Sequence, residues 1–496
     1  HKGSGLYRKY GYGEFLEKVM DCDITEIPGA DNLFLTEGII RETAEKYRAL
    51  YESKKSYLLI NGTSGGLIAA ILASVPAGKK LIMARNCHKS VFNALTLGGI
   101  EPVYAFPSVV EEYGISGAIE PEEIGRLLME NPDSEAVILP SPNYYGICSD
   151  IKAIAEVVHH HGKILIVDQA HGAHLKFFSR FGGAANGIYS GRGGMPLPAE
   201  ECGADIVVNS THKTLASLTQ SAVLNVCSDR VSIFDLEDKL QAIESTSPSY
   251  VLMASLDVNA DLLETHGKEL FDAWAEHLQS FYGRAAEIPG LKLMKVPGLM
   301  DETKINIDMS AYGINGNQLE EMLMSRSIYA ELVTGNILMC MTGIGNSGED
   351  MERLLRALAE IAESASLKKD VGEEHGRMKA GDMKTTPSST IDKTDSLAEA
   401  PCQKGQKDPL ADAARLWTKR RTLHPIPIKK QLLHIDNCCG KICASSVIPY
   451  PPGIPLICPG EEISREDIEY IKALRHAGEK VIGYSTEGQL MVGIDA

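Results

Sequence analysis

The chain has 496 residues, of which 44% are hydrophobic and 23% charged. This is the composition of a globular protein and excludes a wholly disordered, fibrous or membrane-embedded chain. Asp and Glu outnumber Lys and Arg by 66 to 49, and the net charge of −17 disfavours nucleic acid and anionic membranes as partners. At about 150 residues per domain the length predicts about three domains. The 11 scattered cysteines and the absence of a membrane-spanning apolar run predict a cytoplasmic protein with reduced thiols.

Residues 56 to 227 repeat one pattern, in which a short apolar run leads into a polar or Gly-rich break and, in most repeats, a helix-like stretch follows. Strands that alternate with helices predict an α/β fold with a mainly parallel, doubly wound sheet. The predicted strands are 56–60, 80–84, 136–139, 163–167 and 205–208.

Reactive side chains come directly after these predicted strands. Because ligands bind beyond the carboxyl ends of the strands in such sheets, we expect these side chains to converge on one edge. The set comprises Ser64, His88, Asn143, Asp168, His171, Ser210, His212 and Lys213.

Lys213 and Asp168 are the candidates for chemistry, although each has a plain alternative. Lys213 lies between apolar runs, and burial there would depress the pKa of its amine, as an imine-forming lysine requires. The alternative is a surface lysine at a loop edge. Asp168 ends a buried strand and needs a cationic or hydrogen-bonding partner, such as a pyridinium nitrogen. Its alternatives are a metal ligand, a helix cap or a ribose contact.

Two further segments favour a bound cofactor. The loop 62–66 (GTSGG) opens a predicted helix, whose N–H groups suit a phosphate, although a structural turn is the alternative. Ser210 and His212 would complete this phosphate site from another strand. His88 follows a separate strand, where its ring either stacks on a cofactor or begins a helix.

Beyond residue 230 the pattern changes to long helices and then to a smaller α+β unit, 286–365. Residues 366–411 are polar and predict a linker, and four prolines within 449–455 fix an extended turn in a C-terminal segment. The predicted divisions are 1–28, 29–285, 286–365, 366–411 and 412–496.

No metal site is predicted. Three successive histidines, 159–161, point about 100° apart on a helix and cannot share one ion. Cys438, Cys439 and Cys443 lack a second cluster of zinc ligands. The pair Glu461–Glu462 is expected on a solvated face.

Taken together, the motifs resemble the pyridoxal-phosphate enzymes of aspartate-aminotransferase type (fold type I), and within them the ornithine/lysine/arginine decarboxylase family. The C-terminal segment resembles the C-terminal decarboxylase domain of that family, which general aminotransferases lack. The segments that carry the resemblance are 61–66 (NGTSGG), 85–90 (RNCHKS), 141–150 (SPNYYGICSD), 167–174 (VDQAHGAH), 203–224 (GADIVVNSTHKTLASLTQSAVL), 245–257 (STSPSYVLMASLD) and 447–460 (VIPYPPGIPLICPG).

The resemblance implies roles for individual residues. Lys213 would form the aldimine with pyridoxal 5'-phosphate, Asp168 would pair with the pyridine nitrogen, and His88 would stack on the ring. Ala170 would pack on the other ring face and His171 would lie near the phenolic oxygen. The phosphate would be held by Thr63, Ser64, Gly65, Ser210 and His212, with Thr246 reaching the phosphate of a neighbouring subunit.

The resemblance further implies a homodimer or higher oligomer that decarboxylates a small cationic amino acid. Arginine is favoured over lysine and ornithine, and Glu331 is the candidate for binding the distal cation. The competing hypotheses are an aminotransferase or other lyase on the same fold, and a non-catalytic relative.

The sequence departs from the family pattern at two positions, with Gln169 where Glu is usual and Asn209 where Gln is frequent. His1-Lys2-Gly3 resembles the end of a family motif, so we expect residues upstream.

Overall fold

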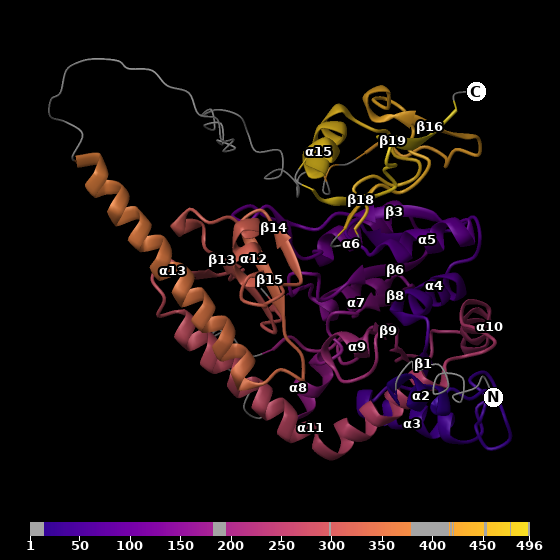
Figure 1. The fold of residues 1–496 in the computed structure, drawn as a ribbon. Helices are drawn as coiled ribbons and strands as arrows, with labels where there is room; N and C mark the ends of the chain where they lie inside the picture. Colours follow the sequence, from indigo (N-terminus) through magenta and orange to yellow (C-terminus); the bar gives the residue numbers. More distant parts are fainter. Residues whose placement is uncertain are drawn as a thin grey trace.

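The computed structural model describes residues 14–181, 195–296, 299–377, 416, 419, 421–450, 454–476 and 478–494. Its centre is the sheet that contains β1, β9, β8, β6 and β3 in Figure 1. This sheet has seven strands, and every strand except β10 runs in the same direction. This confirms the predicted α/β fold class with a mainly parallel sheet. In spatial order the strands are β1 (Lys55–Leu59), β10 (Ala222–Val226), β9 (Ile206–Asn209), β8 (Ile164–Asp168), β6 (Ser134–Pro140), β2 (Lys80–Ala84) and β3 (Glu101–Ala105).

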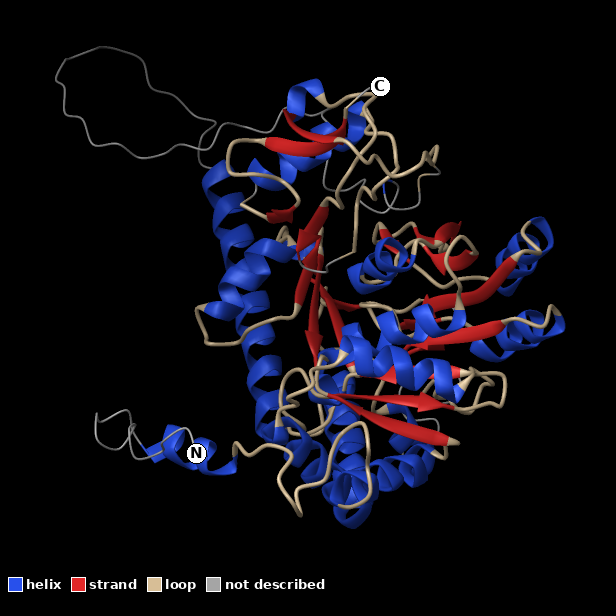
Figure 2. Cartoon of the chain, turned by 90° about the vertical axis from the view of Figure 1, so that its right-hand side faces the viewer, coloured by secondary structure: helices blue, strands red, loops and turns tan. Residues whose placement is uncertain are grey.

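Helices cover both faces of this sheet, as Figure 2 shows. Adjacent residues of a strand point to opposite faces, so Leu59 packs in the core that contains α4, whereas Leu58 packs with Tyr47 and Tyr51 of α3. Because both faces are buried, the central strands are almost continuously apolar. The helices of this part are α2 (Glu14–Cys22), α3 (Ile39–Tyr51), α4 (Gly62–Ser74), α5 (Lys89–Gly98), α6 (Pro121–Glu130), α7 (Ile151–His160), α8 (Leu175–Phe181) and α9 (Thr211–Thr214).

The long helical region after the sheet divides at Ser247-Pro248. The helix α10 (Ile233–Ile243) ends before this break, and α11 (Tyr250–Ala285) begins after it. The side chain of Ser249 caps α11 by accepting a hydrogen bond from the N–H of Leu252. Among the described residues, no helix is both long enough and apolar enough to cross a bilayer.

A smaller antiparallel sheet follows, with the order β11 (Lys292–Leu293), β13 (Lys304–Asp308), β15 (Ile337–Met341) and β14 (Leu332–Thr334). The helix α12 (Gly316–Met324) packs on this sheet, and α13 (Gly348–Arg377) packs along α11 (Figure 1). The helix α13 extends into the range where a linker was expected. Residues 378–411 of that range lie outside the described residues. Short pairs are β4 (Val109–Val110) with β5 (Ile115–Ser116), and β7 (Ile147–Cys148) with β12 (Leu299–Met300).

The C-terminal segment has its own apolar core around α15 (Arg465–His476). Its strands pair as β16 (Lys430–His434) with β19 (Gln489–Gly493), and β17 (Ile448–Tyr450) with β18 (Lys480–Ile482). The expectation that Glu461 lies on a solvated face is wrong. Glu461 is 1% exposed and forms ion pairs with Arg85 and Arg421, which neutralise the buried carboxylate.

Candidate active site

A cavity of about 410 Å³ lies at the carboxyl ends of the parallel strands. It is the edge at which ligands bind in sheets of this kind. Eleven of the residues singled out in the sequence line it: Thr63, Ser64, His88, Asn143, Asp168, Ala170, His171, Ser210, His212, Lys213 and Glu331. Segments that are far apart in the chain therefore meet where their strands end.

Lys213 lies on the short helix α9, directly after β9, and its amine faces His171. The Nζ atom of Lys213 is 2.8 Å from Nε2 of His171. Burial lowers the pKa of Lys213, and the nearby carboxylates of Asp168 and Glu331 oppose this effect. Burial and the Lys213 charge together hold the pKa of His171 well below its usual value. The imidazole is therefore neutral at pH 7 and available to share a proton with the amine.

Asp168 is the last residue of β8, and it is 6% exposed. Burial raises the pKa of this carboxyl, against the N–H of Ala170 and the charge of Lys213. Within the described chain, the Asp168 carboxylate accepts one hydrogen bond, from the N–H of Ala170 at 3.1 Å. A buried carboxylate with one weak partner fits a cationic ligand group such as a protonated pyridine nitrogen.

A group of donors that suits a phosphate forms where α4 begins. Gly62 has a φ of 67°, which allows the chain to turn sharply from β1 into α4. The hydroxyls of Thr63 and Ser210 are 3.1 Å apart, so two strands contribute to one group of donors. With the N-terminal N–H groups of α4, these hydroxyls fit the phosphate of pyridoxal phosphate. Gly65 is buried and does not line the cavity; a Cβ there would lie 3.1 Å from Oε1 of Glu244.

The structure confirms one of the two interpretations of His88, that it begins a helix, and its stacking on a cofactor stays a prediction. Its Nδ1 accepts from the N–H of Ser90 at 3.3 Å, so the side chain caps α5. The same ring lines the cavity. Burial, with a smaller contribution from Lys213, lowers the pKa of His88 to about 4. The ring is therefore an uncharged, flat surface at pH 7, which suits stacking on a cofactor.

The sequence did not indicate the role of Tyr144. Its ring centroid lies 4.3 Å from that of His171, and Lys213 Nζ lies 5.8 Å from the Tyr144 ring. Tyr144 comes four residues after β6, so its position beyond a strand end was the one available signal. Other lining residues that were not predicted are Asn86, Ser116, Thr219, Gln220 and Ile454.

Of two further predicted residues, Glu331 lines the cavity and Thr246 does not. Glu331 lies just before β14 of the smaller sheet and lines the cavity, and burial raises the pKa of its carboxyl against the charges of Lys213 and Lys304. Thr246 is exposed in the turn between α10 and α11 and does not line the cavity of its own chain. Its assignment to a neighbouring subunit stays a prediction.

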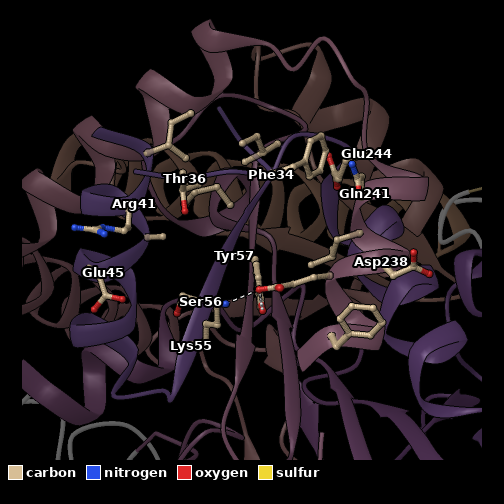
Figure 3. Close-up of a pocket in the computed structure, with 17 residues that line it drawn as sticks. Phe34, Thr36, Arg41, Glu45, Lys55, Ser56, Tyr57, Asp238, Gln241 and Glu244 are labelled. Carbon is tan, nitrogen blue, oxygen red and sulfur yellow. Dashed lines mark hydrogen bonds and ion pairs between the residues drawn. The ribbon is translucent and has the colours of Figure 1, made fainter. Parts of the chain in front are cut away.

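A second cavity lies between α3, β1 and α10 (Figure 3). It contains an ion pair between Lys55 and Glu237, and the Tyr57 hydroxyl also donates to Glu237 at 2.9 Å. These groups satisfy one another, and none of the predicted site residues lines this cavity. Among the described residues, no cluster of His, Cys, Asp and Glu has the arrangement of a metal site.

The sheet topology and the position of the first cavity place this chain in the fold type I class of enzymes. Family models agree: one described as Orn/Lys/Arg decarboxylase, major domain, matches residues 1–288, and one described as the C-terminal domain matches residues 423–493. The chain therefore belongs to the Orn/Lys/Arg decarboxylase family and is a decarboxylase.

Curated relatives and solved structures extend this comparison. The arginine decarboxylase of Bacillus subtilis is 30% identical over 491 residues, covering 97% of this chain and 90% of the relative. The inducible lysine decarboxylase of Escherichia coli K12 is 23% identical, covering 98% of this chain and 76% of the relative. Lysine decarboxylase A from Pseudomonas aeruginosa has the same fold, with a TM-score of 0.78 at 19% identity over 100% of this chain and 77% of that one.

Proposed function

We propose that this enzyme uses pyridoxal phosphate to decarboxylate a basic amino acid, and that arginine is the substrate, giving agmatine and CO₂. The observation that carries the proposal is the cavity itself. It combines a partly buried amine (Lys213), a buried carboxylate with no ion-pair partner in the described chain (Asp168) and a second carboxylate (Glu331).

The residues present fit the cofactor. Lys213 would carry it covalently, Asp168 would pair with its ring nitrogen, and His88 would stack on the ring. Thr63, Ser64 and Ser210 would bind its phosphate, together with the N–H groups at the start of α4. When bound, the cofactor supplies an electron sink for the pair left behind as CO₂ departs.

Lys213 and His171 are placed to exchange a proton at the reacting centre. The neutral imidazole of His171 lies 2.8 Å from the Lys213 amine, so a proton can pass between Nε2 and Nζ. The Tyr144 ring packs against His171, and Ile454 of the C-terminal segment closes another wall of the cavity. We expect these surfaces to contribute to the burial that lowers the pKa of the Lys213 amine.

The lining of the cavity also supports decarboxylation over transamination. A transaminase normally binds the substrate α-carboxylate through an arginine, and no arginine lines the cavity in the described part of the chain. Glu331 supplies the charge that a distal guanidinium or ammonium group would pair with. The arginine decarboxylase of Bacillus subtilis, whose similarity covers 97% of this chain, supports arginine as the substrate.

We also propose a homodimer, in which Thr246 reaches the phosphate of the neighbouring subunit, and a cytoplasmic location. Free thiols at all of the described cysteines support a reducing compartment. The divisions 1–28, 29–285, 286–365, 366–411 and 412–496 remain our proposal for the domain organisation.

Product identification by mass spectrometry, from an equimolar mixture of arginine, lysine and ornithine, tests the proposal. We expect CO₂ and agmatine as the main products. We also expect an absorbance band near about 420 nm with added pyridoxal phosphate, lost in Lys213→Ala and kept in Lys152→Ala, whose side chain is exposed on α7. Keto-acid formation without CO₂ would favour a transaminase, and the absence of any band would favour a non-catalytic relative.

A further inference from the structure

Two polar side chains next to the proposed cofactor residues share one carboxylate. Gln169 follows Asp168, and Asn209 precedes Ser210. The Gln169 amide donates to Oε2 of Glu200 at 2.9 Å and to Oδ1 of Asn209 at 3.0 Å. The Asn209 amide donates to Oε1 of Glu200 at 2.8 Å. The two side chains are therefore joined to each other and to Glu200.

The network continues across the sheet to its edge strand. Asn225 of β10 donates to the same Oε1 of Glu200 at 3.0 Å and accepts from the Ser56 hydroxyl of β1 at 2.7 Å. Ser56 pairs with Asn225 in the strand register, so both point to one face of the sheet. Gln169, Asn209 and Asn225 are each at most 1% exposed, so their hydrogen bonds cannot be replaced by bonds to bulk water.

The donors in this network require one group that only accepts. Three amide N–H groups point at Glu200, and the remaining oxygen of Gln169 accepts from the Ala199 N–H at 2.8 Å. A carboxylate accepts through both oxygens and has no donor, so it satisfies all three amides. An amide at position 200 would direct its own N–H₂ group at one or more of these donors.

We infer that Glu200 is a positioning residue for the cofactor site. It holds the ends of β8 and β9, and hence Asp168 and Ser210, at a fixed separation from each other. The inference rests on the proposed function, because it assigns Asp168 and Ser210 to the cofactor. It also accounts for the two departures from the family pattern, since Gln169 and Asn209 are partners in one network whose negative charge is located at position 200.

Variants that remove the negative charge from position 200, or move it to position 169, test this inference. Glu200→Gln should weaken pyridoxal phosphate binding about tenfold or more and shift the pH midpoint of the 420 nm band, because buried donors lose their acceptor. Gln169→Glu should do the same, since it places two carboxylates in contact. The double variant Q169E/E200Q restores one carboxylate among the same amides, and binding should recover to within about threefold of wild type.

The matched control is Glu201→Gln. Glu201 is the next residue, but it pairs with Lys176 and Ser179 outside the network, so this variant should leave both readouts unchanged. Wild-type binding by Glu200→Gln, or a double variant no better than the worse single variant, would overturn the inference. If Glu200→Gln does not fold, recovery of folded, cofactor-binding protein in the double variant supports it and failure of both overturns it. A wild-type enzyme without the band would instead contradict the proposed function.

Discussion

Arg85 and Glu461 form a buried two-point ion pair that joins the residue after β2 to the C-terminal segment. The guanidinium Nε and Nη2 lie 3.2 and 3.0 Å from the two carboxylate oxygens. Arg85 also donates to the carbonyl oxygens of Pro455 and Leu456. Ile454, which lines the cavity, directly precedes Pro455 in the chain. The pair therefore fixes the part of the C-terminal segment that reaches the proposed active site.

Breaking this pair should destabilise the protein and loosen the cavity. Glu461→Ala leaves Arg85 as a buried charge that has lost its carboxylate, and we expect a loss of about 3–5 kcal/mol in the free energy of unfolding. Urea unfolding of the full-length protein measures this loss, and KM should rise as well. Glu462→Ala removes the adjacent exposed carboxylate and serves as the control. Equal stability of the two variants would contradict this account.

Neutralising Glu331 should mainly affect substrate binding. Glu331→Gln removes the charge proposed to pair with the distal cation, and we expect KM for arginine to rise about 10- to 100-fold with a smaller change in kcat. Steady-state kinetics measures both constants. Glu320→Gln, on α12 and outside the cavity, is the matched control. If Glu331→Gln lowers kcat and leaves KM unchanged, Glu331 does not bind the distal cation.

The ring of Tyr144 should matter more than its hydroxyl. Tyr144→Phe keeps the surface that packs on His171 at a centroid distance of 4.3 Å and should retain most of the activity. Tyr144→Ala removes that surface, admits water beside Lys213, and should lower kcat/KM about tenfold or more. The pH profile of kcat should also shift, because a better-solvated amine has a higher pKa. Equal effects of Phe and Ala would show that the hydroxyl is the important group.

Protonation at His174 should contribute to acid unfolding. Its Nε2 lies 3.1 Å from Asp301, and both side chains are fully buried. Burial lowers the pKa of His174, and Asp301 opposes this effect. As the pH falls below about 6.5, the unfolded state gains a proton there that the folded state resists, so stability falls by up to about 1.4 kcal/mol per pH unit.

Asp301 adds to this effect at lower pH. Burial alone would raise the pKa of Asp301, but His174 and Lys304 hold it well below its usual value. The stability gained from this lowered pKa is fully present above about pH 4 and is lost as the pH falls further.

The His174 contribution is tested by urea unfolding between pH 7 and pH 5. The free energy of unfolding should depend less steeply on pH in His174→Gln than in wild type, because the variant lacks the titrating imidazole. His266→Gln, at an exposed site on α11, should keep the wild-type slope.

The sequence alone determined the parallel strands and the chemical groups at their carboxyl ends. Both signals are local, because a buried parallel strand needs a continuous apolar run and a ligand-binding side chain follows directly after it. Lys213, Asp168 and His88 could therefore be predicted to meet without knowledge of the strand order.

Only the tertiary structure decided which distant groups are partners. The reversed direction of β10, the burial of Glu461 beside Arg85 and the sharing of Glu200 by Gln169 and Asn209 depend on packing between separate segments. Arg85 and Glu461 are 376 positions apart, and no local pattern records such a pairing. From the sequence, a carboxylate in a polar stretch is predicted to be solvent-exposed. Whether it is instead buried and paired with a cation depends on contacts that form only in the assembled core.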